Sequence, residues 1–209
     1  MNCCGFLAAK GARSEPDRCF QSNVIAATTL ADCAALFGLP YVMISTDLVF
    51  DGTRSVAYIE RDMTKPLGHF GQTKWEAERQ VKAAHLEALI LRTGPLFGAS
   101  SREMLAAALH HAARDAGIRP HRELIVSPTY IPDLADALLD LLIDGASGLW
   151  HLVNDGAISA DDLLRRVLPD EAERHRLQGR SACNLALTSQ RGLLLPKLGA
   201  ALDRFRAVT

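Results

Sequence analysis

The chain has 209 residues, of which 48% are hydrophobic and 22% charged, and its formal net charge is −1 at pH 7. That length supports one sizeable core with room for a small attached lobe. A near-neutral balance without a basic face argues against nucleic acid or an anionic membrane as a main partner. The N-terminus lacks the pattern of a signal peptide, and no apolar run reaches the roughly 18 to 20 residues that span a bilayer. We therefore expect a cytoplasmic protein.

The cysteines and histidines do not form a metal or disulfide pattern. The five cysteines are odd in number and show no CxxC spacing, which fits reduced thiols better than a disulfide framework. The seven histidines show no HExxH spacing. We therefore expect no metal site.

The first half of the chain alternates short apolar runs with helical periodicity. Ser14 and Pro16 are typical of a helix start, and Gly38 followed by Pro40 ends the next helical pattern. In order, we expect the end of a buried strand at 1–5, a helix at 23–37, a strand at 41–45, a helix at 74–84 and a strand at 88–93. This alternation is typical of parallel βαβ units. The expected fold class is therefore α/β, a partial Rossmann-type parallel sheet with flanking helices.

The second half of the chain predicts a less regular arrangement. Pro132 opens a strongly apolar amphipathic pattern, and Ser159 is placed to cap a helix. We expect helices at 102–116, 131–143 and 198–207, another helix after Ser159, and strands at 123–126 and 149–153. Residues 1–99 would form an incomplete dinucleotide-binding portion. Residues 100–209 would form mainly a small C-terminal α+β substrate lobe, with some segments returning to the main sheet.

Six motifs occur in an order that one family shares. They are ISTDLVFDG (44–52), YIERD (58–62), PLGHFGQTK (66–74), LILRT (89–93), SPTYIPDLADAL (127–138) and GLWHLVNDGAIS (148–159). In this order and with these gaps, the chain resembles dTDP-4-dehydrorhamnose reductase and its relatives among the extended short-chain dehydrogenases/reductases. The resemblance implies a nucleotide-binding α/β domain, a small sugar-nucleotide lobe, and hydride transfer from NADPH or NADH to the 4-keto group of a dTDP-sugar.

The resemblance also implies roles for individual residues. Thr46 matches the active-site hydroxyl of the STD motif, and Lys74 matches the lysine that holds the nicotinamide ribose. The cofactor-binding positions would be Cys3, Cys4, Gly5, Asn23, Ser45 and Lys74, of which Asn23 matches the structural asparagine of the family's helix. In the family a tyrosine four residues before the lysine protonates the substrate oxygen, and the lysine lowers the pKa of that tyrosine.

The sequence departs from the family at two features needed for catalysis. Phe70 stands in the tyrosine's place, and the loss of a general acid typically lowers the rate by about 10² to 10⁴. No GxxGxxG turn is present, since Gly5 and Gly11 do not fit that spacing. The family's first strands have no counterpart before Met1, so we expect an N-terminal truncation, weak dinucleotide binding, and an uncovered sheet flank through which homo- or hetero-oligomers would form.

Three hypotheses for function follow. The first is a truncated, catalytically impaired 4-keto sugar nucleotide reductase. The second is a non-catalytic sugar-nucleotide-binding or regulatory subunit, for which the β subunit of methionine adenosyltransferase, a similar family member, is a precedent. The third is a gene fragment whose first segment is encoded upstream.

The site residues have structural alternatives as well. Lys74 would then be a solvated partner of Glu78 at i, i+4. Thr46 and Asp47 would only cap the loop after their strand. His151 would be a core histidine with satisfied hydrogen bonds.

Overall fold

A parallel sheet organises the molecule. The computed structural model describes residues 1–2, 12, 14–98, 105, 109, 124–168, 183–192 and 195–207. The sheet has the order β1-β2-β6 and comprises β1 (Val42–Thr46), β2 (Leu89–Thr93) and β6 (Gly148–His151), all parallel. On the far side of β1, the Asn2 amide donates to the Val42 carbonyl at 2.9 Å in an isolated parallel bridge. The parallel α/β fold expected from the sequence is confirmed.

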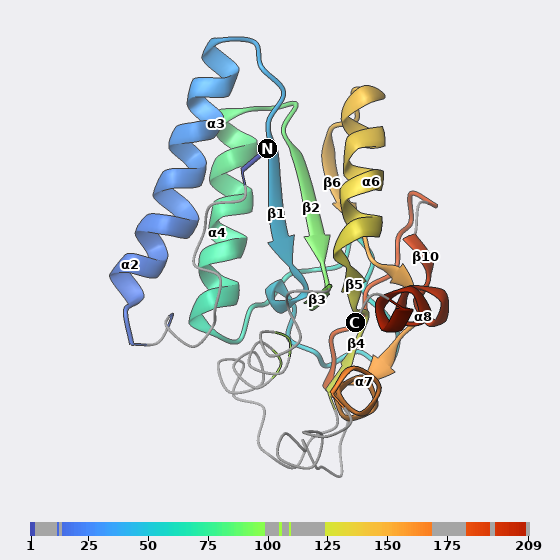
Figure 1. Ribbon diagram of the computed structural model, residues 1–209. Helices are drawn as coiled ribbons and strands as arrows, with labels where there is room; N and C mark the ends of the chain where they lie inside the picture. Colours follow the sequence, from blue (N-terminus) through green and yellow to red (C-terminus); the bar gives the residue numbers. More distant parts are fainter. Residues whose placement is uncertain are drawn as a thin grey trace.

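Helices cover both faces of this sheet (Figure 1). On one face lie α4 (His69–Ala84) and a continuous rod made of α2 (Pro16–Phe20), the π-helix η1 (Gln21–Ile25) and α3 (Ala26–Leu36). Ala27 and Ala31 of the rod and Val81 of α4 pack there against Met43 and Ile90. On the other face α6 (Ile131–Ile143) packs its leucines against the alternate strand residues. Burial on both faces explains why these strands are continuous apolar runs.

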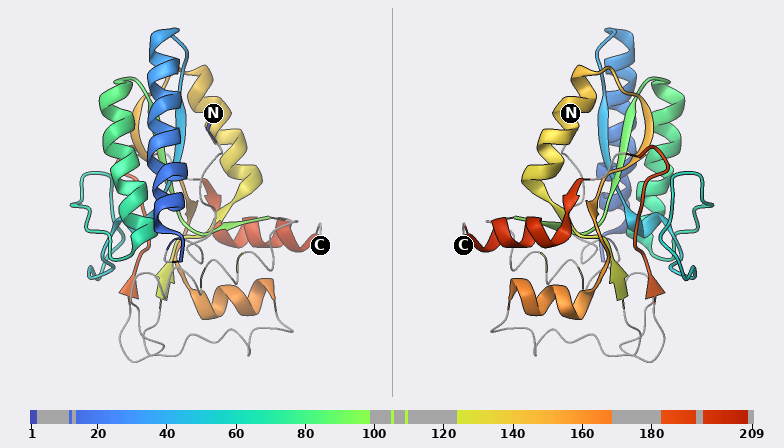
Figure 2. Two further views of the ribbon diagram at one scale, coloured as in Figure 1. Left: turned by 90° about the vertical axis from the view of Figure 1, so that its left-hand side faces the viewer. Right: turned by 90° about the vertical axis from the view of Figure 1, so that its right-hand side faces the viewer.

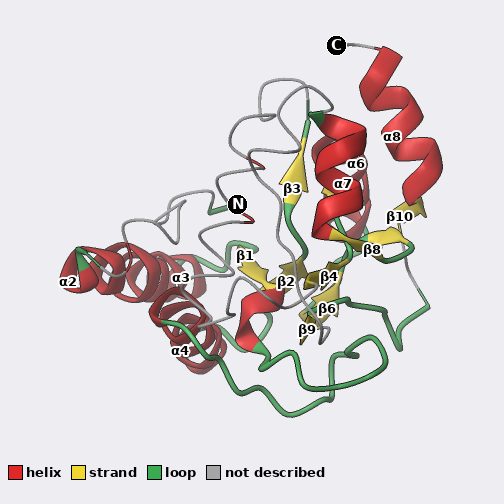
Figure 3. Ribbon diagram, turned by 90° about the horizontal axis from the view of Figure 1, so that it is seen from below, coloured by secondary structure: helices red, strands yellow, loops and turns green. Residues whose placement is uncertain are grey.

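The remaining elements gather beyond the carboxyl ends of the sheet strands (Figures 1 and 3). They are the 3-10 turn η2 (Asp47–Val49), β3 (Leu96–Phe97), β4 (Leu124–Val126), β5 (Thr129–Tyr130), β7 (Asn154–Asp155), β8 (Ile158–Ser159), α7 (Ala160–Val167), β9 (Cys183–Asn184), β10 (Leu195–Lys197) and α8 (Leu198–Ala207). A second small sheet has the order β8-β4-β9. A separate apolar cluster that includes Phe97, Leu163 and Phe205 holds these elements together.

Most expected elements agree with the structure, with small corrections. Ser159 caps α7 by accepting a hydrogen bond from the Asp162 amide at 3.1 Å. The helix expected to start at Ser14 and Pro16 begins at Pro16, and its N-cap is Glu15, which makes no side-chain capping bond. The helix expected at 102–116 lies outside the described residues except for Leu105 and Leu109. Among the described helices, none has the length and hydrophobicity needed to cross a membrane.

Candidate functional site

The site lies at the carboxyl end of β1, where Thr46 ends the strand. Its Oγ1 donates to Asp47 Oδ1 at 3.0 Å and accepts from the Leu48 amide at 3.2 Å, so Thr46 also acts as the N-cap of η2. Asp47 is only 4% exposed, and burial raises its pKa to about 7, although hydrogen bonds from Thr46 and nearby amides oppose this. Ligands of open α/β sheets bind beyond such strand ends.

Lys74 reaches the same strand from α4. Its Nζ donates to the Ile44 carbonyl at 3.1 Å, two residues before Thr46. Burial lowers the pKa of the Lys74 ammonium, and the negative charge of Glu78 partly opposes this shift. Lys74 is therefore a partly buried cation anchored beside the strand end, not the solvated partner of Glu78 considered above.

Phe70 lies one helical turn before Lys74, in the first turn of α4. The Lys74 ammonium is 6.0 Å from the centre of the Phe70 ring, at the outer limit of a cation–π contact. The ring thus occupies the place next to the ammonium but offers no proton. Among the described residues no tyrosine hydroxyl bonds to Lys74, since Tyr41 donates to the Ala27 carbonyl and Tyr58 to Asp51.

A buried ion pair lies behind the site, between α4 and β2. Arg92 forms a bidentate pair with Glu78, with Nη2 to Oε2 at 2.6 Å and Nε to Oε1 at 2.9 Å. Ser45 of β1 donates to the same carboxylate at 2.5 Å. Both charged groups are almost fully buried. Ser45 therefore points toward this ion pair and links β1 to α4 and β2.

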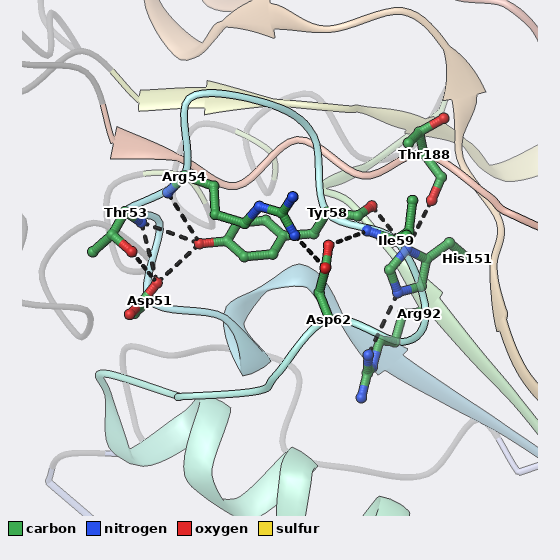
Figure 4. A network of polar contacts seen from close by, with 9 residues as sticks. All are labelled: Asp51, Thr53, Arg54, Tyr58, Ile59, Asp62, Arg92, His151 and Thr188. Atoms are coloured by element: carbon green, nitrogen blue, oxygen red, sulfur yellow. Dashed lines mark hydrogen bonds and ion pairs between the residues drawn. The ribbon is translucent and has the colours of Figure 1, made fainter.

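The ion pair continues into a buried histidine. His151 of β6 is fully buried, with Nε2 3.5 Å from Arg92 Nη1 and Nδ1 2.9 Å from the Thr188 carbonyl (Figure 4). Burial lowers the pKa of His151, and the positive charge of Arg92 acts in the same direction. Its amide donates to Glu60 at 2.9 Å. His151 is accordingly a core histidine with hydrogen-bond partners.

The connection between η2 and α4 is fixed by a second polar network (Figure 4). The Tyr58 hydroxyl donates to Asp51 at 2.9 Å and accepts from the Thr53 amide at 3.1 Å. Asp62 accepts from the Ile59 amide and pairs with Arg54. These contacts hold the segment that leads to Phe70 and Lys74, although none of them touches either residue.

Asn23 lies within the π-helix η1. Its side-chain amide donates to Thr73 Oγ1 at 2.9 Å and to Cys19 Sγ at 3.4 Å. Asn23 thereby joins the α2–α3 rod to α4 next to Lys74. This contact is consistent with a structural role.

Two of the expected site residues lie together at the end of β1. Lys74, which we expected at the nicotinamide ribose, bonds to the Ile44 carbonyl, and Thr46, which we expected as the active-site hydroxyl, is the last residue of the strand. A diphosphate needs backbone N–H groups at a glycine-rich turn before a helix, and the described residues contain no such turn. Cys3, Cys4 and Gly5, which we expected at the cofactor, lie outside the described residues. The described part of the chain also contains no cluster of side chains arranged to hold a metal.

Sequence reasoning missed the Glu78–Arg92 pair and the raised pKa of Asp47. An arginine after the apolar run Leu89–Leu91 of the buried strand β2 was the available signal, because a fully buried arginine needs a carboxylate partner.

Comparison with known proteins identifies the family. The model of the RmlD substrate binding domain matches residues 1–191. The chain belongs to this family. The curated dTDP-4-dehydrorhamnose reductase of Mycolicibacterium smegmatis is 31% identical over 205 residues, which cover 91% of this chain and 63% of the relative. That of Mycobacterium tuberculosis H37Rv is 31% identical over 176 residues, covering 81% of this chain and 58% of the relative. The RmlD-family chain thus spans about three fifths of these relatives.

Solved structures show the same fold. The crystal structure of dTDP-4-dehydrorhamnose reductase from Bacillus anthracis in complex with NADP has a TM-score of 0.77 and 23% identity, covering 99% of this chain and 79% of that chain. The structure of MoeE5 in complex with UDP-glucose and NAD has a TM-score of 0.69 and 18% identity, covering 98% and 76%. At these identities the likeness concerns the fold.

Proposed function

We propose that this chain is a dTDP-4-dehydrorhamnose reductase-like unit for NAD(P)H-dependent reduction of a 4-keto sugar nucleotide, and that its catalysis is impaired. The observation that carries the proposal is Phe70 beside Lys74, with Thr46 at the end of the adjacent strand. NADP or NAD would supply hydride when bound. Lys74 would contribute positive charge and Thr46 a hydroxyl at the substrate oxygen, and residues 100–209 would mainly hold the sugar nucleotide.

The missing step is proton donation. As hydride arrives at the carbonyl carbon, the oxygen needs a proton, and a benzene ring cannot donate one. Purified protein with NADPH and a 4-keto dTDP-sugar should therefore show turnover about 10² to 10⁴ below that of an intact relative. Turnover comparable to the M. smegmatis reductase would refute the impairment.

A substitution at position 70 sharpens this test. Phe70→Tyr restores the general acid and should raise any measurable turnover, yet not to the level of an intact relative, because the sequence has no GxxGxxG turn to hold the diphosphate. Lys74→Met in the same background serves as the control and should abolish the gain. No gain from Phe70→Tyr, despite measurable binding of the dTDP-sugar, would contradict the role assigned to position 70.

The second candidate is a non-catalytic sugar-nucleotide-binding or regulatory subunit. The Phe70 ring favours it, because it fills the space beside Lys74 without a reactive group. Calorimetric titration with a dTDP-sugar, combined with the turnover assay, separates the candidates. Binding without turnover in both the natural chain and Phe70→Tyr supports the second candidate, and turnover gained by Phe70→Tyr supports the first.

A further inference from the structure

The amine of Lys74 has an unusual set of neighbours for a lysine. Its Nζ donates to the Ile44 carbonyl at 3.1 Å, and among the described residues no carboxylate lies within ion-pair distance of it. Glu78, one turn further along α4, is at the spacing that normally gives an ion pair. Its two carboxylate oxygens are held by Arg92 and Ser45 instead. The amine therefore lies against a neutral backbone oxygen.

A second neighbour of this amine is apolar. The centre of the Phe70 ring is 6.0 Å from Lys74 Nζ, where a benzene ring attracts a cation only weakly. Burial lowers the pKa of Lys74, because water is withheld from the charged form, and the charges of Glu78 and Cys19 oppose this shift in part. The free amine, which is the nucleophilic form, is therefore more abundant at neutral pH than in an exposed lysine.

The position of Lys74 gives small molecules access to this amine. The residue is partly exposed, and α4 begins at the end of the molecule where β1 and β2 have their carboxyl ends (Figure 2). Thr46, two residues after Ile44, is the last residue of β1. Ligands of open α/β sheets bind beyond such strand ends. A small molecule that binds there meets a partly desolvated amine.

We propose that Lys74 captures aromatic aldehydes covalently as an imine on Nζ, with the Phe70 ring as the stacking surface for the aromatic ring of the aldehyde. Aromatic pairs prefer ring centres roughly 4.5 to 7 Å apart. A ring joined to Nζ through one imine carbon can lie at that separation, because Nζ itself is 6.0 Å from the centre of Phe70. This activity goes beyond the reductase function and needs neither a dinucleotide nor a sugar nucleotide.

Imine formation is balanced without an oxidant or a reductant. The ammonium of Lys74 releases a proton to solvent, and the lone pair of the free amine forms a bond to the carbonyl carbon while the C=O π electrons move to oxygen. That oxygen takes the proton that the nitrogen then loses, which gives a carbinolamine. The nitrogen lone pair expels the hydroxyl, which takes up a proton from solvent and leaves as water. A protonated imine remains.

Reductive trapping tests the proposal. The protein is incubated near neutral pH with benzaldehyde and cyanoborohydride, which reduces the imine to a stable benzylamine, and peptide mass spectrometry follows the label on each lysine. Lys74 should be labelled at least about tenfold faster than Lys82, because its amine is less often protonated. Lys82 is the matched internal control, since it is exposed on the same helix. Lys74→Arg should lose the fast label and keep that of Lys82, with circular dichroism confirming the fold.

A second variant tests the stacking surface. Phe70→Leu keeps an apolar side chain but removes the ring, so the ratio of the Lys74 labelling rates with benzaldehyde and butanal should fall at least about threefold. Labelling of Lys74 no faster than that of Lys82 overturns the proposal, and so does a ratio that Phe70→Leu leaves unchanged. The assay contains no NAD(P)H and no sugar nucleotide, so its failure is distinct from a failure of the reductase function.

Discussion

Two polar regions meet at β1 and differ in how completely their groups are satisfied. Behind the strands, Glu78 receives two bonds from Arg92 and one from Ser45. At the strand end, Asp47 is equally buried, but its carboxylate has only Thr46 and nearby amides as partners, and its pKa rises to about 7. The first region holds α4 to the sheet. The second keeps a poorly compensated acid where ligands of this fold bind, as expected for a site whose groups are not arranged for stability.

The largest effect should come from breaking the region behind the strands. Arg92→Met leaves the Glu78 carboxylate buried without its cation, and the free energy of unfolding should fall by about 3 to 5 kcal/mol. Urea denaturation followed by circular dichroism measures this loss. Arg79→Met is the control, because Arg79 pairs with Glu76 at 2.7 Å in an exposed setting, and its removal should cost less than about 1 kcal/mol. Equal effects of the two variants would remove the distinction between the regions.

A smaller effect is expected at Asp47, where a substitution should raise the free energy of unfolding. Its folded pKa lies above the unfolded value, so its contribution to stability is present below about pH 4 and is lost as the pH rises through about 7. Asp47→Asn removes the buried charge and should raise the free energy of unfolding by about 2 kcal/mol near pH 8, with a smaller gain near pH 5. Denaturation at both pH values measures this. Asp32→Asn, at an exposed position, is the control. If Asp47→Asn lowered the free energy of unfolding near pH 8, Asp47 would belong with the stabilising groups behind the strands.

The smallest effect should come from the Thr46 hydroxyl. Thr46→Val keeps the side-chain shape but leaves the Leu48 amide without its acceptor at 3.2 Å, which should cost about 1 kcal/mol. Thr53→Val, in an exposed turn, is the control. A cost of several kcal/mol at Thr46 would mean that the strand end is part of the stabilising framework, contrary to the comparison above.

Sequence reasoning predicted the elements better than their side-chain partners. The bounds of α6 and α8 match the expectation because a proline opens α6 and strong periodicity marks both helices. Local periodicity also placed Lys74 and Phe70 on one face of α4. It could not reveal that Glu78 bonds to Arg92 and not to Lys74, because this choice depends on how β2 lies against α4. The roles of Thr46, Lys74 and Phe70 in catalysis stay predictions.

Sequence reasoning also missed the π-helix η1, which determines which residues of α2 face the core. In an unbroken α-helix Phe20 would share a stripe with Val24, Ala27 and Ala31, which are all buried. The wider turn, closed by the Ala26 amide on the Gln21 carbonyl, holds one additional residue and turns everything before it by roughly 100°. As a result, Cys19 is buried and Phe20 is exposed. Deleting one residue between Phe20 and Val24 would thus restore a regular α-helix and still keep Cys19 in the core, because Cys19 would then precede Val24 by four residues.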